Sequence, residues 1–147
     1  MRLAADLVFV AMLAVVTVTD LRERRIPNRV LIAAVALGLP LLAVSGPGTL
    51  PGRLVAALTA GAVFLLAVLV RPGGFGIGDV KLIATMGLFL GGAVVGAVLV
   101  ALLAGSLAGA ALFARHGTAA AKLTIPFGPF LALGGLVALS GWIPLLQ

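Results

Sequence analysis

The sequence predicts an all-α polytopic membrane protein, a bundle of about six transmembrane helices that forms a single domain over residues 1–147. Hydrophobic residues make up 63% of the chain and charged residues only 10%, with a mean hydropathy of +1.32. This composition lies far outside that of a usual soluble domain. Apolar runs also recur at about the 20-residue length that crosses a hydrocarbon core, where helices satisfy the backbone of an open chain.

Charge, proline and glycine divide the chain into segments. The first apolar stretch reaches Thr19 and leads directly into Asp20 and a basic loop, so we interpret it as a retained span rather than a signal peptide. The run Val80–Phe113 would extend about 50 Å as one helix, well beyond a core of about 30 Å. We expect a break at Gly91-Gly92, although a mere kink there would reduce the count to five spans. The six expected segments cover residues 3–19, 29–44, 53–70, 80–91, 93–113 and 126–146.

The distribution of basic residues predicts the orientation of these spans. With the amino terminus outside, eight of the ten Lys and Arg residues fall in or beside the inner loops, and only Arg2 and Arg53 fall on the outer side. The positive-inside rule favours this arrangement. We therefore expect a multi-pass protein of the cell inner (plasma) membrane with Asp20 and Asp79 at its cytoplasmic face. The inner loops are then residues 20–28, 71–79 and 114–125.

The composition also argues against several kinds of partner and cofactor. The net charge of +6 comes from residues in short loops, where it signals topology, so we expect no nucleic-acid partner. The chain has no cysteine and a single histidine, His116, so we expect no metal site and no cofactor. Small residues at four-residue spacing in the later spans predict close helix packing, either within the chain or in a homo-oligomer. Membrane lipid is the expected surrounding.

Two aspartates dominate the candidate site. Asp20 and Asp79 stand at the polar ends of hydrophobic segments in a chain with only four acidic residues. A carboxylate near hydrocarbon is costly, so a pair at one membrane face suggests a functional site. Neighbouring carboxylates do not both ionise easily, and this asymmetry equips a pair for hydrolysis with one water. The structural alternatives are an ion pair with nearby arginines for Asp20 and a helix N-cap for Asp79.

Residues beside the aspartates are expected to shape the site. Gly76 and Gly78 remove side chains next to Asp79, which would let an extended substrate backbone come close. Pro27 and Asn28 are expected to end the first inner loop and to cap the second helix.

Four further residues have both a functional and a structural interpretation. Lys81 could bias the charge of the site or extend to the membrane interface. Glu23 could receive part of a basic substrate segment or balance its neighbouring arginines. Pro126 and Gly128 should loosen the start of the last helix and expose backbone groups, which could hold a substrate in extended form.

Three motifs carry a resemblance to a known family. They are Asp-x-x-x-Arg-x-Ile-Pro-Asn at 20–28, Gly-x-Gly-Asp-x-Lys-Leu at 76–82 and Ile-Pro-Phe-Gly-Pro-Phe-Leu-Ala-Leu at 125–133. In this order, and with the intervening spans, they resemble the type IV prepilin peptidases over nearly the whole chain. The chain resembles a short, peptidase-only form, because it has no cysteine and lacks the region with paired Cys-x-x-Cys motifs. A methyltransferase function is therefore not implied.

The resemblance implies an aspartic endopeptidase with Asp20 and Asp79 as its catalytic pair, acting at the cytoplasmic face. The implied partners are pilin or pseudopilin precursors. These are cut after the glycine that ends a short basic leader, just before a hydrophobic helix. Which aspartate acts as the base stays open at this point.

Two other functions compete with this interpretation. One is a proton-coupled membrane carrier in which the two aspartates relay protons, which would favour acids near the middle of the bilayer. The other is an inactive assembly scaffold, which the intact pair of aspartates argues against.

Overall fold

The computed structural model describes residues 1–71, 76–117 and 126–141 of the chain. Within these ranges it contains six α-helices and two short 3₁₀ helices, so the predicted all-α membrane bundle of about six helices is confirmed. The end of the sixth expected segment, Lys122 in the third inner loop and Ile125 of the third motif lie outside the described residues. The α-helices are α1 Arg2–Glu23, α2 Asn28–Ser45, α3 Leu50–Val70, α4 Ile77–Leu90, α5 Val94–His116 and α6 Gly128–Leu139, and the 3₁₀ helices are η1 Pro47–Thr49 and η2 Gly91–Ala93.

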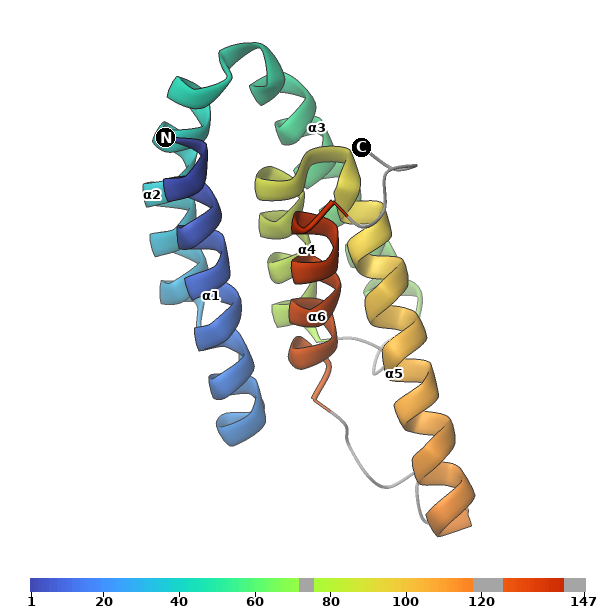
Figure 1. Ribbon diagram of the computed structural model, residues 1–147. Helices are drawn as coiled ribbons and strands as arrows, with labels where there is room; N and C mark the ends of the chain where they lie inside the picture. The colour runs from blue at the N-terminus through green and yellow to red at the C-terminus, as the bar shows by residue number, and fades with distance from the viewer. Residues whose placement is uncertain (72–75, 118–125, 142–147) are drawn as a thin grey trace.

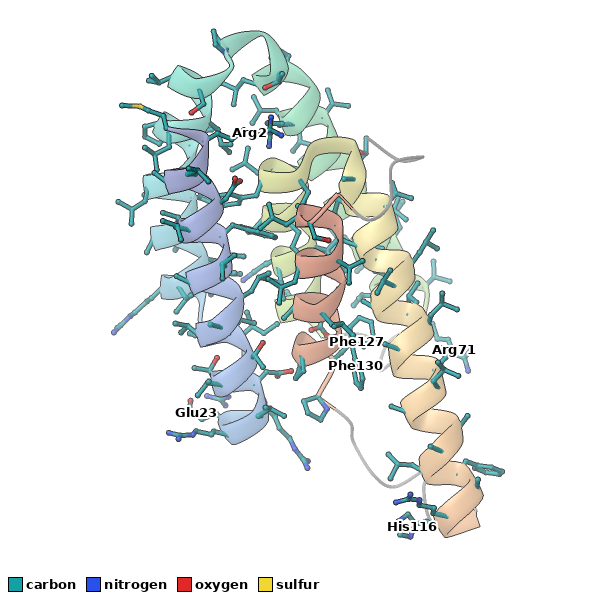
Figure 2. The ribbon with its side chains drawn as sticks, viewed as in Figure 1. Arg2, Glu23, Arg71, His116, Phe127 and Phe130 are labelled. Atoms are coloured by element: carbon teal, nitrogen blue, oxygen red, sulfur yellow. The ribbon has the colours of Figure 1, made fainter. Side chains whose placement is uncertain are left out.

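The helices run up and down in an antiparallel bundle (Figure 1). The amino terminus, η1 and η2 lie at one end, and Arg2 marks this end in Figure 2, with Glu23 and His116 at the opposite end. Consecutive helices pack as pairs, α1 with α2, α3 with α4 and α5 with α6, and α6 also packs along α1. The first and last helices are therefore neighbours in space.

The core lies where α1, α4 and α6 meet. The rings of Phe9 and Phe89 stack with their centroids 5.2 Å apart, which joins α1 to α4. By contrast α3, which the structure describes in full, has no buried residue and turns its apolar side chains outward. In lipid this costs little, because the hydrocarbon is as apolar as the side chains. The largest fully buried side chains are Phe9, Leu13, Val16, Leu82, Ile83, Met86 and Leu131.

Small residues let the helix pairs approach closely, as their spacing predicts. A Cβ added to Gly87 of α4 would lie 2.7 Å from the Cα of Ala57 in α3, and one added to Gly134 of α6 would collide with the carbonyl oxygen of Ala97 in α5. Without a hydrophobic force between helices in lipid, such backbone contact is a main source of attraction. Gly87 therefore serves internal packing rather than contact with another molecule.

The long apolar run breaks at Gly91-Gly92, which confirms the expected separation of two helices. Gly91 adopts φ 62° and ψ −137°, a conformation that is essentially restricted to glycine. On the far side of the break, the Nη1 atom of Arg53 in α3 donates hydrogen bonds to the carbonyl oxygens of Leu88 and Phe89. These bonds satisfy carbonyls that the end of α4 leaves without a helical partner.

Two helix boundaries differ from the prediction, and both changes affect the site. The first helix continues to Glu23 instead of ending at residue 19, so Asp20 lies within its last turn rather than in a loop. The fourth begins at Ile77 instead of residue 80, so Asp79 lies in its first turn. The cause is local hydrogen bonding, which extends a helix past the end of its apolar run and which hydropathy alone does not register.

Four helical segments are long and apolar enough to cross a membrane, the last being the 40-residue stretch Ile77–His116 that bends at η2. With 14 residues, α4 alone measures about 21 Å, and the described part of α6 is shorter still. At the end opposite η2, α1 and α5 extend well beyond α4 and α6 (Figure 1). The first turns of α4 and α6 are therefore recessed within the bundle.

The contact between α3 and α4 can be tested with two glycine variants. Gly87→Ala should lower the free energy of unfolding by about 1–3 kcal/mol, because the added methyl group forces two helix backbones apart. Gly109→Ala is the control, since nothing in the described part of the chain lies within 4 Å of its added Cβ. It should be neutral or stabilise by up to about 1 kcal/mol through helix propensity. Thermal unfolding in detergent measures both, and a Gly87→Ala protein as stable as the control would contradict this packing.

Candidate active site

A polar pocket lies where the end of α1 faces the start of α4. Its volume is about 330 Å³, and both Asp20 and Asp79 line it although they are far apart in the sequence. The structure thus brings together the two aspartates that the sequence singled out. The full lining consists of Asp20, Arg24, Arg25, Ile26, Asn28, Gly76, Ile77, Gly78, Asp79 and Lys81.

Asp20 is held by the start of the last described helix. The side chain is buried, with 6% of the residue exposed, and its Oδ2 atom accepts a hydrogen bond of 2.8 Å from the backbone N–H of Gly128. That N–H belongs to the first turn of α6, where donors lack helical partners and the helix dipole favours negative charge. A Cβ on Gly128 would lie 2.7 Å from the same oxygen, so glycine is required for this approach.

Local geometry ends α1 just after Asp20. The backbone N–H of Arg24 donates to the carbonyl oxygen of Asp20 at 3.0 Å, and Arg24 itself adopts the left-handed conformation, with φ 51°. This is the usual way in which a helix stops, although glycine is the more common residue there. The turn directs Arg25 and Ile26 toward the pocket, and Asp20 keeps a rigid helical backbone.

Asp79 is held by its own helix. It is the third residue of α4, and its Oδ2 atom accepts a hydrogen bond of 3.1 Å from the backbone N–H of Gly76. The backbone N–H of Asp79 in turn donates to the carbonyl oxygen of Gly76 at 3.0 Å. Asp79 therefore closes the start of α4 from the third position and is not the N-cap itself, which is Gly76.

The two glycines before Asp79 have different roles. A Cβ on Gly78 would lie 3.2 Å from the Cβ of Ile26, so the missing side chain there admits Ile26 of the α1–α2 loop. Gly78 thus brings α4 against the loop rather than only opening space for a substrate. Gly76 is exposed, and its added Cβ would meet chiefly the Asp79 carboxylate, at 3.3 Å. Of the two, Gly76 keeps the accessible backbone that was expected.

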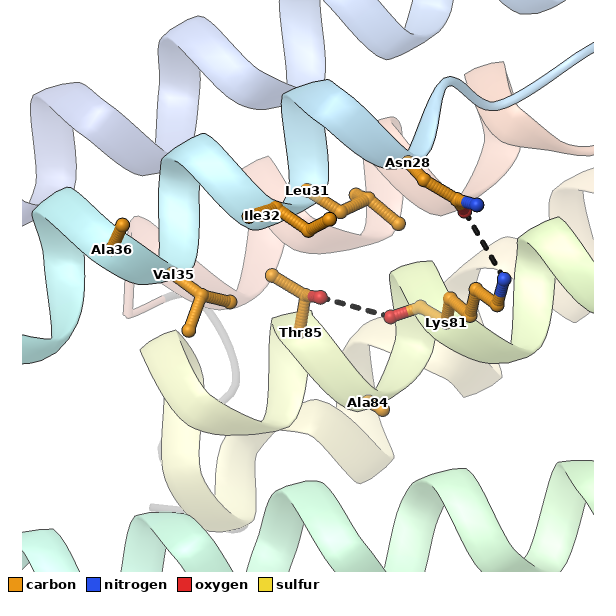
Figure 3. Close-up of a pocket in the computed structure, with 8 residues that line it drawn as sticks. All are labelled: Asn28, Leu31, Ile32, Val35, Ala36, Lys81, Ala84 and Thr85. Carbon is orange, nitrogen blue, oxygen red and sulfur yellow. Dashed lines mark hydrogen bonds between the residues drawn. The ribbon is translucent and has the colours of Figure 1, made fainter.

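Asn28 does not cap α2, which corrects the prediction. Pro27 occupies the N-cap position in an extended conformation and does end the loop, but α2 has no side-chain capping bond. Instead the Oδ1 atom of Asn28 accepts a hydrogen bond of 3.1 Å from the Nζ atom of Lys81 (Figure 3). The bond joins the start of α2 to α4, one turn after the first turn that carries Asp79, and both residues line the pocket.

The remaining predicted site residues lie farther from the aspartates. Glu23 is exposed at the end of α1 and is not part of the pocket lining. Pro126 is half-buried just before α6 and also lies outside the lining. The N–H of Gly128 was expected to be exposed for a substrate but is buried against Asp20, so that expectation is wrong.

Sequence reasoning missed several residues that line the pocket. Arg24, Arg25 and Ile26 fall within the motif between Asp20 and Asn28, so their place in that short string was the available signal. Among the described residues, no group of three His, Cys, Asp or Glu side chains is positioned to hold a metal ion. Two carboxylates with nearby cationic and backbone donors make an arrangement suited to acid–base chemistry on a neutral polar bond.

The fold and the pocket define a helical membrane protein with a pair of carboxylates at one end of its bundle. The chain belongs to the type IV leader peptidase family, whose model matches residues 7–114 and so includes both aspartates. It is also 37% identical over 142 residues to the prepilin leader peptidase/N-methyltransferase of Bacillus subtilis (strain 168). That match covers 89% of this chain and 53% of the relative, so the chain spans about half the length of the relative. No solved structure matches the chain significantly.

The bond between Asp20 and Gly128 can be tested independently of activity. Asp20→Asn and Asp20→Ala both remove the charge, but only the alanine variant also removes the acceptor for the buried N–H. The alanine variant should therefore be less stable than the asparagine variant by about 1–3 kcal/mol, the usual cost of leaving a buried donor without a partner. Thermal unfolding in detergent gives the comparison. Equal stability of the two variants would show that the bond does not hold α6 in place.

Proposed function

We propose that the protein is a membrane aspartic endopeptidase, with residues 1–147 forming one peptidase domain. In this proposal Asp20 and Asp79 cut the short basic leader from type IV pilin-like or pseudopilin precursors, just before the hydrophobic segment. The observation that carries the proposal is the shared pocket of the two aspartates in a member of a leader peptidase family.

The chemistry follows from two acids that share a confined space. Their mutual repulsion favours a state in which one carboxylate is ionised and the other keeps a proton. The ionised carboxylate draws a proton from a water molecule, whose oxygen attacks the carbonyl carbon of the scissile peptide bond. The protonated carboxyl group donates to the carbonyl oxygen and later protonates the leaving amine. The reaction needs no metal and no cofactor.

The backbone of the site supports this division of labour. Asp20 and Asp79 each accept a hydrogen bond from a backbone N–H at the start of a helix, which fixes one oxygen of each carboxylate. Fixed carboxylates lose little entropy when the water and the peptide bond are brought into position. The recess between the longer α1 and α5 would separate the scissile bond from bulk water (Figure 1).

The charge distribution supports a cytoplasmic location for the pocket. Most of the described basic residues, including Arg24, Arg25 and Lys81, lie at the pocket end of the bundle, and Arg2 and Arg53 lie near the other end. The positive-inside rule then assigns the pocket end to the cytoplasm. The basic lining also makes long-range attraction of a basic leader unfavourable, so recognition would depend on the apolar part of the substrate.

The positions of the acids disfavour the competing proton carrier. All four acidic residues of the chain lie near helix ends: Asp20, Glu23 and Asp79 near one end of the bundle and Asp6 near the other. A relay across the membrane would need titratable groups near the middle of the bilayer. A pair confined to one face is instead suited to a local reaction.

The role of the pair can be tested with a matched set of carboxamide variants. Asp20→Asn and Asp79→Asn should each lower the rate of precursor cleavage by about 10²–10⁴-fold or more, because each removes a proton donor or acceptor at the reacting bond. Asp6→Asn is the matched control, since Asp6 lies on α1 as Asp20 does but lines a different pocket. Purified protein, a synthetic precursor and gel or mass analysis of the product give the rates. Wild-type cleavage by either test variant would overturn the proposal.

Metal independence gives a second test of the mechanism. An excess of a metal chelator should leave the cleavage rate of the purified protein unchanged, because two carboxylates and one water suffice for the proposed reaction. A metallopeptidase with a known chelator response, assayed in the same detergent, serves as the control. Inhibition that added zinc or magnesium reverses would contradict the mechanism.

A further inference from the structure

An apolar groove runs along the face between α2 and α4, beside the aspartate pocket (Figure 3). Its volume is about 560 Å³. Small and branched apolar side chains form most of its wall, and the hydroxyl of Thr85 donates to the carbonyl oxygen of Lys81 at 2.9 Å. The polar atom of Thr85 is thus tied to its own helix. The lining residues are Asn28, Leu31, Ile32, Val35, Ala36, Lys81, Ala84 and Thr85.

This groove is continuous with the aspartate pocket. Asn28 and Lys81 line both spaces, and the hydrogen bond between them marks the boundary. Two other apolar grooves, one between α1 and α2 and one between α3 and α5, share no lining residue with the aspartate pocket in the described part of the chain. A segment lying in the α2–α4 groove would therefore reach the two carboxylates directly.

We propose that this groove binds the first turns of the substrate's apolar segment, immediately after the scissile bond. The inference rests on the proposed function and deepens it by assigning a binding surface. The proposed substrate changes from polar to apolar at the cut, and the enzyme changes from a polar pocket to an apolar groove at Asn28 and Lys81. From Asn28 to Ala36, α2 rises about 12 Å, which matches roughly two helical turns of a bound segment.

The polar pair at the boundary suits a peptide better than a lipid chain. A peptide bond must leave the helical conformation before two carboxylates and a water can reach its carbonyl group. The unwound backbone groups then need hydrogen-bond partners at membrane level, where water is scarce. The side-chain amide of Asn28 and the ammonium group of Lys81 stand at this point and can supply them. An acyl chain has no use for either.

The absence of cysteine from the chain allows a direct test by disulfide cross-linking. Ile32→Cys and Ala36→Cys place single thiols in the groove, and Ala33→Cys places one on the same helix in the groove between α1 and α2. Each is combined with Asp79→Asn to retain uncut precursor. The precursor carries a single cysteine at successive positions after the scissile bond. Mild oxidation in membranes links only thiols whose Cβ atoms come within about 3.5–4.5 Å.

The expected result is cross-linking from positions 32 and 36 but not from position 33. The best substrate position for Ala36→Cys should lie about four residues farther from the cut than that for Ile32→Cys, because both helices rise equally per residue. Equal cross-linking at all three positions, or none in the groove while the wild-type enzyme cuts the same precursor, would overturn the groove. Failure of the wild-type enzyme to cut the precursor would instead remove the proposed function.

A kinetic comparison uses the same two alanines. Ala36→Phe should fill the groove and lower cleavage of the full precursor by at least about tenfold, because displacement of the bound segment misplaces the scissile bond. Ala33→Phe, an equal change at another exposed alanine of α2, should leave the rate near that of the wild type. A peptide that ends a few residues after the cut should be cleaved alike by both variants. Equal loss with the full precursor would contradict the assignment.

Discussion

The contact between the Asp20 carboxylate and the backbone N–H of Gly128 is the constraint on which the rest of the site depends. A buried carboxylate is costly unless hydrogen bonds compensate its lost hydration. The start of α6 supplies both a donor and the positive end of a helix dipole. The same contact joins the first helix to the last described one, far apart in sequence. A buried acid that could serve catalysis therefore also organises the bundle.

The second carboxylate is positioned by a different set of contacts. Gly78 admits Ile26, and Lys81 bonds to Asn28, so the first turns of α4 are held against the α1–α2 loop on two sides. At the other end of α4, Arg53 satisfies its last carbonyl groups. A short helix fixed at both ends places Asp79 in a recess, at the height of the last turn of α1. In the proposed mechanism, this arrangement aligns the two acids before a substrate arrives.

The sequence was informative wherever the cause is local. Composition and apolar run length predicted the membrane bundle, the two glycines at 91 and 92 predicted the break, and charge placed Asp20 and Asp79 at one end. The partner of Asn28, the packing role of Gly78 and the donor at Gly128 were not predicted. Each of these depends on a helix distant in sequence, and no periodicity or spacing along the chain encodes which helix that is. Catalysis by the pair stays a prediction.

The central claim is that the two aspartates face one pocket and act together on one bond. Its most direct test is a double variant, Asp20→Cys with Asp79→Cys, treated in membranes with a short bifunctional thiol reagent and digested for mass spectrometry. The account predicts an intramolecular link between positions 20 and 79, and none when Asp6→Cys replaces Asp20→Cys. Absence of the first link, or equal yields of both, would contradict a shared pocket and with it the proposed pair.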